Sequence, residues 1–278
     1  MDHQILLAIF PQVLLDGVIL GFMYALIALG YTMVYGVLEF INFAHSEIFI
    51  FGAFVGVEIL LGLKAAGLLD TLSPFLVLAF LLLAGMLASG LLAVAVERVA
   101  YRPLLGSSRL ALLLSALGMS FFLQNFVMLA QGARDKTFPE GIVRGGFHLG
   151  SEATVSTIKV LIVGLSLLLM GWLHWLVRRT RIGNAMRAVA QDATASSLCG
   201  VRTARVVSFT FAIGSALAAA AGVMISLYYR QVDTTMGFTA GLKAFTAAVL
   251  GGIGSIPGAM LGGLTLGMAE NYAARYVS

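Results

Sequence analysis

The sequence has very few charged residues. Asp, Glu, Lys and Arg make up 11% of the 278 residues, hydrophobic residues make up 60%, and the mean hydropathy is +0.98. Charged residues are about a quarter of an ordinary soluble domain, so this composition excludes a soluble domain and predicts an integral membrane protein. Six or seven apolar runs are long enough to cross a bilayer, and they leave no room for a separate soluble domain.

Residues with special chemistry are scarce as well. Cysteine occurs once, at Cys199, which excludes an internal disulfide. No GxxxxGK[ST] loop is present, so ATP that drives this protein must be bound by another subunit. The four histidines, at positions 3, 45, 148 and 174, show no metal-binding spacing such as HExxH. We therefore expect no metal or cofactor in this chain, and an intramembrane enzyme is the weakest functional class.

Positive charge is concentrated in two short windows. Three of the 17 Lys and Arg residues lie in residues 98–109 and six lie in residues 178–205. Two expected spans, 110–130 and 158–177, separate the windows, so both fall on one side of the membrane, as the positive-inside rule requires. The pattern marks the cytoplasmic side, not a nucleic-acid surface, and it places the N-terminus outside. The first four residues, MDHQ, carry no basic region, so the first apolar run is expected to be a retained span.

The second basic window is the one long polar segment. Residues 184–198 are rich in Ala and lack Pro, and Gly200 follows as a plausible stop, so a helix is expected there. One weakly apolar face of this helix would carry Met186, Val189, Ala190, Ala193 and Ser197. Such a helix lies under a bilayer, where a partner protein can grip it. The alternative is a basic loop that only sets the topology.

A polar cluster separates the first apolar run from the second. It contains Glu39, Asn42, His45, Ser46 and Glu47, and bulky apolar residues lie between them. Because isolated charges are costly inside hydrocarbon, buried ionisable groups face a pathway or a partner helix. We select Asn42, His45 and Glu47 as candidates for a substrate pathway or gate. The alternative places Glu39 and Glu47 at the level of the lipid headgroups.

The last apolar run, residues 236–272, contains a break and a lysine. Gly251, Gly252, Gly254 and Pro257 predict two shorter helices with irregular backbone between them, a feature tolerated only where protein or water covers the freed backbone groups. Lys243, also a pathway candidate, is expected to snorkel to the interface or to pair with Glu47 or Glu270.

Three motifs carry a resemblance that covers essentially the whole chain. INFAHSEIFIFGAF at 41–54, the segment 178–200 with its RAVAQD core, and GFTAGLKAFTAAVLGGIGSIPGAMLGG at 237–263 resemble the LivH-type permease subunits of branched-chain amino acid ABC importers. The resemblance implies an all-α polytopic membrane protein with about seven to nine transmembrane helices, some broken or short, and a cytoplasmic coupling helix. It implies one permease domain over residues 1–278, with the coupling segment at about 178–205.

The resemblance also implies partners and coupling residues. A LivM-like second permease, two ATP-binding subunits and a periplasmic binding protein would work with this chain in the bacterial inner membrane. Carried onto this sequence, the coupling residues are Gly183, Arg187, Ala190, Asp192 and Gly200. Ser46 departs from the family's usual glycine, and the family usually continues beyond position 278 into one more helix.

Two other transport functions stay open. Broken helices and buried Glu are also signs of a proton- or sodium-coupled secondary transporter, which would work without an ATPase. Within the ABC importers, urea or short amides are an alternative cargo, because related permeases share these motifs. A polar but uncharged path suits a zwitterion with an apolar side chain, and selectivity would then rest with the binding protein.

Overall fold

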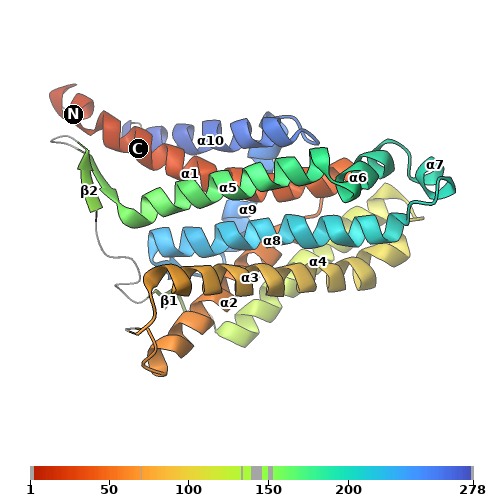
Figure 1. Cartoon of the computed structure of the whole chain (residues 1–278), viewed down its shortest axis with the longest axis horizontal. Coiled ribbons are helices and arrows are strands. Elements are labelled where there is room, and N and C mark those ends of the chain that lie inside the picture. The colour runs from red at the N-terminus through yellow and green to blue at the C-terminus, as the bar shows by residue number, and fades with distance from the viewer. Residues whose placement is uncertain (1–2, 70, 133, 139–145, 150–152, 277–278) are drawn as a thin grey trace.

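The computed structural model describes residues 3–69, 71–132, 134–138, 146–149 and 153–276, and these residues are mostly helical (Figure 1). The helices long enough to matter for the membrane are α1 (His3–Leu38), α2 (His45–Ala65), α3 (Pro74–Val96), α4 (Arg109–Gln131), α5 (Thr157–Arg179), α8 (Thr203–Tyr229), α9 (Met236–Leu250) and α10 (Ile256–Tyr276). A π-helical turn, η1 (Glu97–Tyr101), and a 3-10 turn, η2 (Arg102–Leu104), extend α3. Two short helices, α6 (Arg181–Gln191) and α7 (Ala193–Leu198), follow α5.

Six of these helices, α1, α2, α3, α4, α5 and α8, are long and apolar enough to cross a membrane. The 15-residue α9 is apolar but shorter, and α10 lies antiparallel along α1. Within the described residues, six candidate spans and one shorter apolar helix make up most of the bundle, so the expected all-α polytopic fold is confirmed. The Gly/Pro break is also confirmed, because α9 ends at Leu250 and α10 begins at Ile256.

The core lies along α1 and α8, whose apolar windows are the most buried of the six spans. The Ala, Gly and Ser residues between Gly214 and Gly222 of α8 explain this position, because small side chains let helix backbones approach closely in a membrane. Gly214 meets the backbone of Gly30 in α1, and Gly222 meets the Phe49 carbonyl in α2. In contrast, α3, α4 and α5 turn large apolar side chains outward, as expected of helices that face lipid.

The contact between α1 and α10 also depends on glycine. A Cβ at Gly17 would meet Met268, a Cβ at Gly21 would meet Leu264, and a Cβ at Gly267 would meet the backbone of Gly21. The spacing of Gly17 and Gly21, four residues apart, thus lets α10 pack closely against α1.

Both basic windows lie at the same end of the bundle. Arg102, in the first window, donates to the Ala204 carbonyl inside the second window at 3.4 Å and to Ser208 Oγ just after that window at 2.6 Å. In Figure 1 this end carries α6 and α7 on the right, and both chain termini lie at the other end. The shared side predicted by the positive-inside rule is confirmed, and we take this end as cytoplasmic.

The opposite end carries short strands. Strand β1 (Lys136–Thr137) pairs antiparallel with β4 (Gln231–Val232), and β2 (Gly146–Leu149) pairs antiparallel with β3 (Ala153–Ser156). Lys136 makes an ion pair with Glu58 of α2, so the acidic residue inside that expected span lies on the outer surface with a cationic partner. The pairing of β1 with β4 and the ion pair with Glu58 tie the connection between α4 and α5 to the rest of the bundle.

Glycines at helix contacts should be far less replaceable than glycines on the lipid-facing surface. We expect Gly267→Ala to lower the melting temperature in detergent, because overpacking a tight contact costs about 1–3 kcal/mol. The matched control is Gly171→Ala in α5, where an added Cβ meets nothing within 4 Å. That change should be neutral or gain up to about 1 kcal/mol. Equal melting temperatures for the two variants would contradict the packing described for α1 and α10.

Candidate functional site

The polar segment between α1 and α2 begins with a sharp turn of the backbone. Glu39 adopts a positive φ of 54° after the end of α1, and its exposed carboxylate accepts a hydrogen bond from Arg109 at 2.8 Å. Glu39 therefore lies at the cytoplasmic end of the bundle. This position fits the interpretation that placed it near the lipid headgroups. Helix α2 then starts at His45, and its first three residues, His45, Ser46 and Glu47, are all buried. Glu47 therefore lies inside the protein, whereas Glu39 is exposed on its surface.

His45 fills a notch between the two central helices. A Cβ at Gly30 of α1 would collide with the His45 ring, and Gly214 of α8 packs against Gly30 at the same level. Tyr31 stacks edge-on against the imidazole, with ring centroids 4.6 Å apart. The Ile27 carbonyl faces the ring, but within the described part of the chain neither ring nitrogen meets hydrogen-bond geometry. At least one nitrogen of the buried imidazole is therefore without a hydrogen-bond partner among the described residues.

Asn42 links this segment to the cytoplasmic end of α3. Its Oδ1 accepts a hydrogen bond of 2.7 Å from the hydroxyl of Tyr101, which lies in the π-helical turn η1. The Tyr101 ring packs against Phe40 and Phe211, so the contact joins the α1–α2 connection, η1 and α8. Among the described residues, Asn42 Nδ2 has no hydrogen-bond partner.

Glu47 is buried next to α9. Ser46 Oγ donates to the Phe43 carbonyl at 2.9 Å and lies 3.3 Å from Glu47 Oε1, while Glu47 Oε2 has no hydrogen-bond partner among the described residues. The extra side chain at Ser46 fits because Gly237 and Gly241 of α9 pass directly over it. The departure from the family's usual glycine at Ser46 is thus accommodated by two glycines on the facing helix.

Lys243 lies in a separate cluster. Its Nζ is 2.6 Å from Glu270 Oε1, and the Tyr24 hydroxyl donates to Glu270 Oε2 at 3.0 Å. Of the three expected arrangements, the pair with Glu270 is the one that forms. The structure therefore brings Asn42, His45 and Glu47 together around the start of α2 and keeps Lys243 with α10 and α1.

The basic segment folds as two helices, so the expectation of one helix over 184–198 is wrong. Asp192 interrupts it with an extended φ of −158°, and its Oδ1 accepts from the backbone N–H of Thr194 and Ala195 at 2.8 and 2.9 Å. An Asp N-cap starts a new helix because it satisfies the free N–H groups of the first turn. Gly200, with φ of 85°, ends α7 and confirms the expected glycine stop.

The buried face of this segment differs in part from the expected one. Met186 and Val189 are buried, as expected, whereas Ala193 and Ser197 are exposed and Ser196 is buried instead. The break at Asp192 explains the difference, because it changes the phase of α7 relative to α6.

Helix α6 is fixed tightly to the end of α5. Thr180 caps α6 by accepting from the Gly183 N–H at 3.1 Å and donates its hydroxyl to the Leu176 carbonyl at 2.6 Å. A Cβ at Gly183 would collide with the carbonyls of Leu176 and Val177, so only glycine permits this approach. Arg187 donates to the Val177 carbonyl and to Asn184 Oδ1. These contacts hold α6 in a fixed position against the end of α5.

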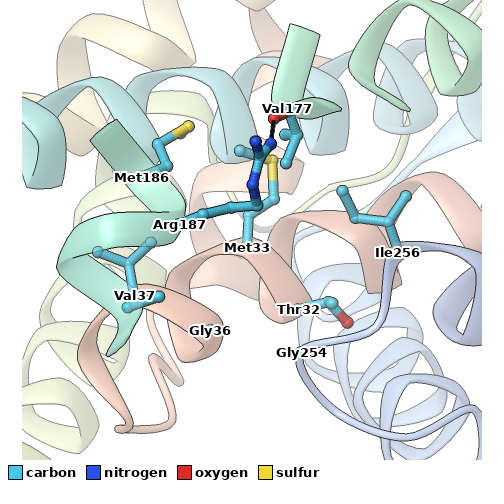
Figure 2. A pocket seen from close by; sticks show the side chains of 10 residues that line it. Thr32, Met33, Gly36, Val37, Val177, Met186, Arg187, Gly254 and Ile256 are labelled. Atoms are coloured by element: carbon cyan, nitrogen blue, oxygen red, sulfur yellow. Dashed lines mark hydrogen bonds between the residues drawn. The ribbon is translucent and has the colours of Figure 1, made fainter. Parts of the chain in front are cut away.

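A cleft of about 90 Å³ lies between α6 and the cytoplasmic end of α1. Its walls come from four elements, and the lining residues include Thr32, Met33, Gly36, Val37, Val177, Met186, Arg187, Ala190, Gly254 and Ile256. Figure 2 shows the Arg187 side chain reaching toward Val177 above Met33, with Gly254 on the opposite wall. Two expected coupling residues, Arg187 and Ala190, therefore share one cleft with the helix break.

The helix break is a tight turn at this cleft. Gly252 and Gly254 have φ values of 87° and 94°, a region that favours glycine. The carbonyl of Gly251 meets Gly258 so closely that a side chain fits at neither position. Pro257 lies in the first turn of α10, where its missing N–H is tolerated. The turn lies beside α6, at the end of the bundle that we take as cytoplasmic.

One buried polar group, around Glu97, is not predicted by the sequence pattern. Glu97 is fully buried and accepts two hydrogen bonds from Arg102, at 2.9 and 3.0 Å, and one of 2.8 Å from Ser208. The sequence did contain a signal for the ion pair, because Glu97 ends an apolar run and Arg102 follows five residues later. Its partner Ser208, on α8, could not be read from the sequence.

This combination defines a class of protein: an integral membrane transport subunit, with an apolar helix bundle, a buried polar segment and a helical cytoplasmic segment seated against the bundle. A family model described as the branched-chain amino acid transport system permease component matches residues 13–278, and the chain belongs to that family.

Individual relatives are similar over nearly the whole chain. The high-affinity branched-chain amino acid transport system permease protein LivH of Salmonella typhimurium is 45% identical over 273 residues, which cover 97% of this chain and 87% of the relative. The corresponding permease protein BraD of Pseudomonas aeruginosa is 45% identical over 267 residues, covering 95% and 86%. An inward-facing structure described as a metal-chelate type ABC transporter covers 100% of this chain and 82% of its own, with a TM-score of 0.53 and 16% identity. That likeness concerns the fold alone.

The ion pair between Lys243 and Glu270 should contribute measurably to stability. Lys243→Glu puts two carboxylates together in a partly buried site, so we expect a lower melting temperature in detergent. The double variant Lys243→Glu/Glu270→Lys restores an ion pair and should recover most of the loss. The matched control is Arg109→Glu, which breaks the highly exposed pair with Glu39 and should change stability by less than about 1 kcal/mol. If the double variant were no more stable than Lys243→Glu, the pair would not be the cause.

Proposed function

We propose that this chain is a permease subunit of an ATP-driven importer of branched-chain amino acids in the bacterial inner membrane. The observation that carries the proposal is the cleft in which the cytoplasmic helix α6 meets α1 and the turn between α9 and α10. The names of the relatives at 45% identity supply the cargo class.

The energy enters through other subunits. This chain has no P-loop, so two ATP-binding subunits on the cytoplasmic side hold and hydrolyse ATP, and the chain itself is not an enzyme. The exposed residues of α6 and α7 form the surface that these subunits grip. The expected coupling residues fix the shape of this surface. Gly183 allows the close contact with α5, and Arg187 and Ala190 line the cleft. Asp192 caps the start of α7, and Gly200 ends it.

Movement of α6 reaches the polar segment along α1. Thr32, Met33 and Gly36 of α1 line the cleft, and Gly30, which holds the His45 ring, lies six residues before Gly36. At 1.5 Å per residue this is about 9 Å along the helix. A shift of the cytoplasmic end of α1 therefore opens or closes the notch around His45 and alternates the access of the pathway.

Asn42, His45 and Glu47 act in this proposal as the gate. Each has a polar atom without a hydrogen-bond partner among the described residues. Such groups are ready to bind water or the charged ends of a zwitterion during the transport cycle. A LivM-like second permease completes the pathway, and a periplasmic binding protein delivers the amino acid.

Uptake of labelled leucine tests the function. Cells expressing the chain with its partner permease, ATP-binding subunits and binding protein should accumulate leucine, and accumulation should persist when the proton gradient is collapsed while cellular ATP is maintained. Omitting either the ATP-binding subunits or the binding protein should abolish it. Uptake by the chain alone that stops when the gradient collapses would identify a secondary carrier. ATP-dependent uptake of urea instead of leucine would overturn the cargo.

Charge reversal in the cleft tests the coupling. Arg187→Glu removes the contacts with Val177 and Asn184, so we expect leucine uptake to fall at least about 5-fold, the lower end of a typical coupling effect. Membrane insertion should stay normal, and ATP hydrolysis should no longer respond to the binding protein. The matched control is Arg179→Glu, the same charge change on an exposed residue outside the cleft. Unchanged uptake in Arg187→Glu would exclude the coupling role.

A further inference from the structure

A second hollow lies between α3 and α8 at the cytoplasmic end of the bundle. Its volume is about 540 Å³. One wall includes Val94, Arg98 and Arg102, from α3 and the turns that extend it. The other wall includes Arg205, Phe209 and Ala212 of α8. We call this hollow the α3–α8 groove. It is separate from the cleft at α6, because the two share no lining residue.

The groove changes character with depth. Arg98 and Arg205 are exposed at its cytoplasmic mouth, and Val94 and Phe209, each four residues further into the bundle, are half-buried. One turn deeper the groove closes, because Gly90 of α3 packs against the backbone of Ala212. At 1.5 Å per residue, Arg98 and Gly90 are about 12 Å apart along the helix. A cationic mouth thus leads to an apolar floor.

The arginines at the mouth are uncompensated. Arg102 is committed to the buried carboxylate of Glu97 and to Ser208. In contrast, the side chains of Arg98 and Arg205 make no hydrogen bond or ion pair within the part of the chain that the structure describes. The mouth therefore offers two free guanidinium groups on neighbouring helices, a geometry that suits an anionic oxygen cluster such as a phosphate.

The apolar side of the groove opens toward lipid. Leu83, Leu87 and Leu91, spaced by four residues on α3, are 59%, 66% and 73% exposed. Leu91 lies one turn from Val94, so this stripe continues into the groove. An apolar chain in the groove would run along these leucines in the membrane. A soluble anion would leave the apolar floor uncovered.

We propose that the α3–α8 groove binds an anionic phospholipid of the cytoplasmic leaflet, with its phosphate between Arg98 and Arg205 and an acyl chain over Val94 and Phe209. Basic pockets between transmembrane helices on the cytoplasmic side are suited to such headgroups. The bound lipid bridges α3 and α8 beside the contact of Glu97, Arg102 and Ser208. The proposal does not depend on which cargo the protein transports.

The test uses the assembled transporter, purified in mild detergent, with phosphatidylglycerol and phosphatidylethanolamine as probes in native mass spectrometry. The wild type should prefer phosphatidylglycerol. In Arg98→Gln/Arg205→Gln its affinity should fall about 30-fold, because each arginine near the headgroups contributes a factor of about five. Arg98→Lys/Arg205→Lys, which keeps both charges, should retain the preference for phosphatidylglycerol.

Two further variants make the result specific to the groove. Arg178→Gln/Arg179→Gln removes two exposed charges at the same end of the bundle but outside the groove, and it should leave the preference unchanged. Ala212→Leu keeps both arginines and fills the closed end, so it should weaken lipid binding. The proposal is overturned if the glutamine variant binds phosphatidylglycerol as tightly as the wild type or if the control pair loses as much. It is also overturned if the assembled wild-type transporter retains no phosphatidylglycerol, since a partner subunit would then occupy the groove.

Discussion

The close approach of α1 to its neighbours is the constraint on which the rest of the structure depends. Gly17 and Gly21 admit α10, Gly30 admits α8 and the His45 ring, and Gly36 admits the turn at Gly254. Apolar surface provides little drive for helices to associate inside a bilayer, so packing at these backbone contacts holds the bundle together. Because one helix makes all these contacts, the cytoplasmic cleft, the buried polar segment and the ion pair of Lys243 are connected through a single element.

The polar atoms around the start of α2 are the least satisfied part of this core. Leaving a buried donor or acceptor without a partner costs about 1–3 kcal/mol. Asn42, His45 and Glu47 each carry such an atom among the described residues, and all three side chains are buried. Purely apolar residues would pack there at lower cost. Their presence supports a role in which water or a cargo molecule completes the hydrogen bonding for part of the cycle.

The sequence predicted most of the bundle but not its contacts between distant segments. The apolar runs gave the spans within a few residues, and the Gly/Pro series near Gly252 gave the break. The interruption at Asp192 was readable in principle, since Asp before Ala, Thr and Ala is a common helix start, but the Ala-rich composition favoured one continuous helix. The contact of Glu97 with Ser208 and the pairing of Lys243 with Glu270 depend on which helices become neighbours. Hydropathy and spacing carry no information about that choice.

The length of α9 has a consequence for the surrounding bilayer. Fifteen residues span about 22 Å, less than the roughly 30 Å of hydrocarbon beside a full-length helix. Phe238 and Leu242 on its outer face are exposed, so this short apolar surface meets either a locally thinned bilayer or another subunit. Both arrangements relieve the hydrophobic mismatch, and their balance varies with membrane thickness. Lipid chain length should therefore influence how readily this face finds a partner.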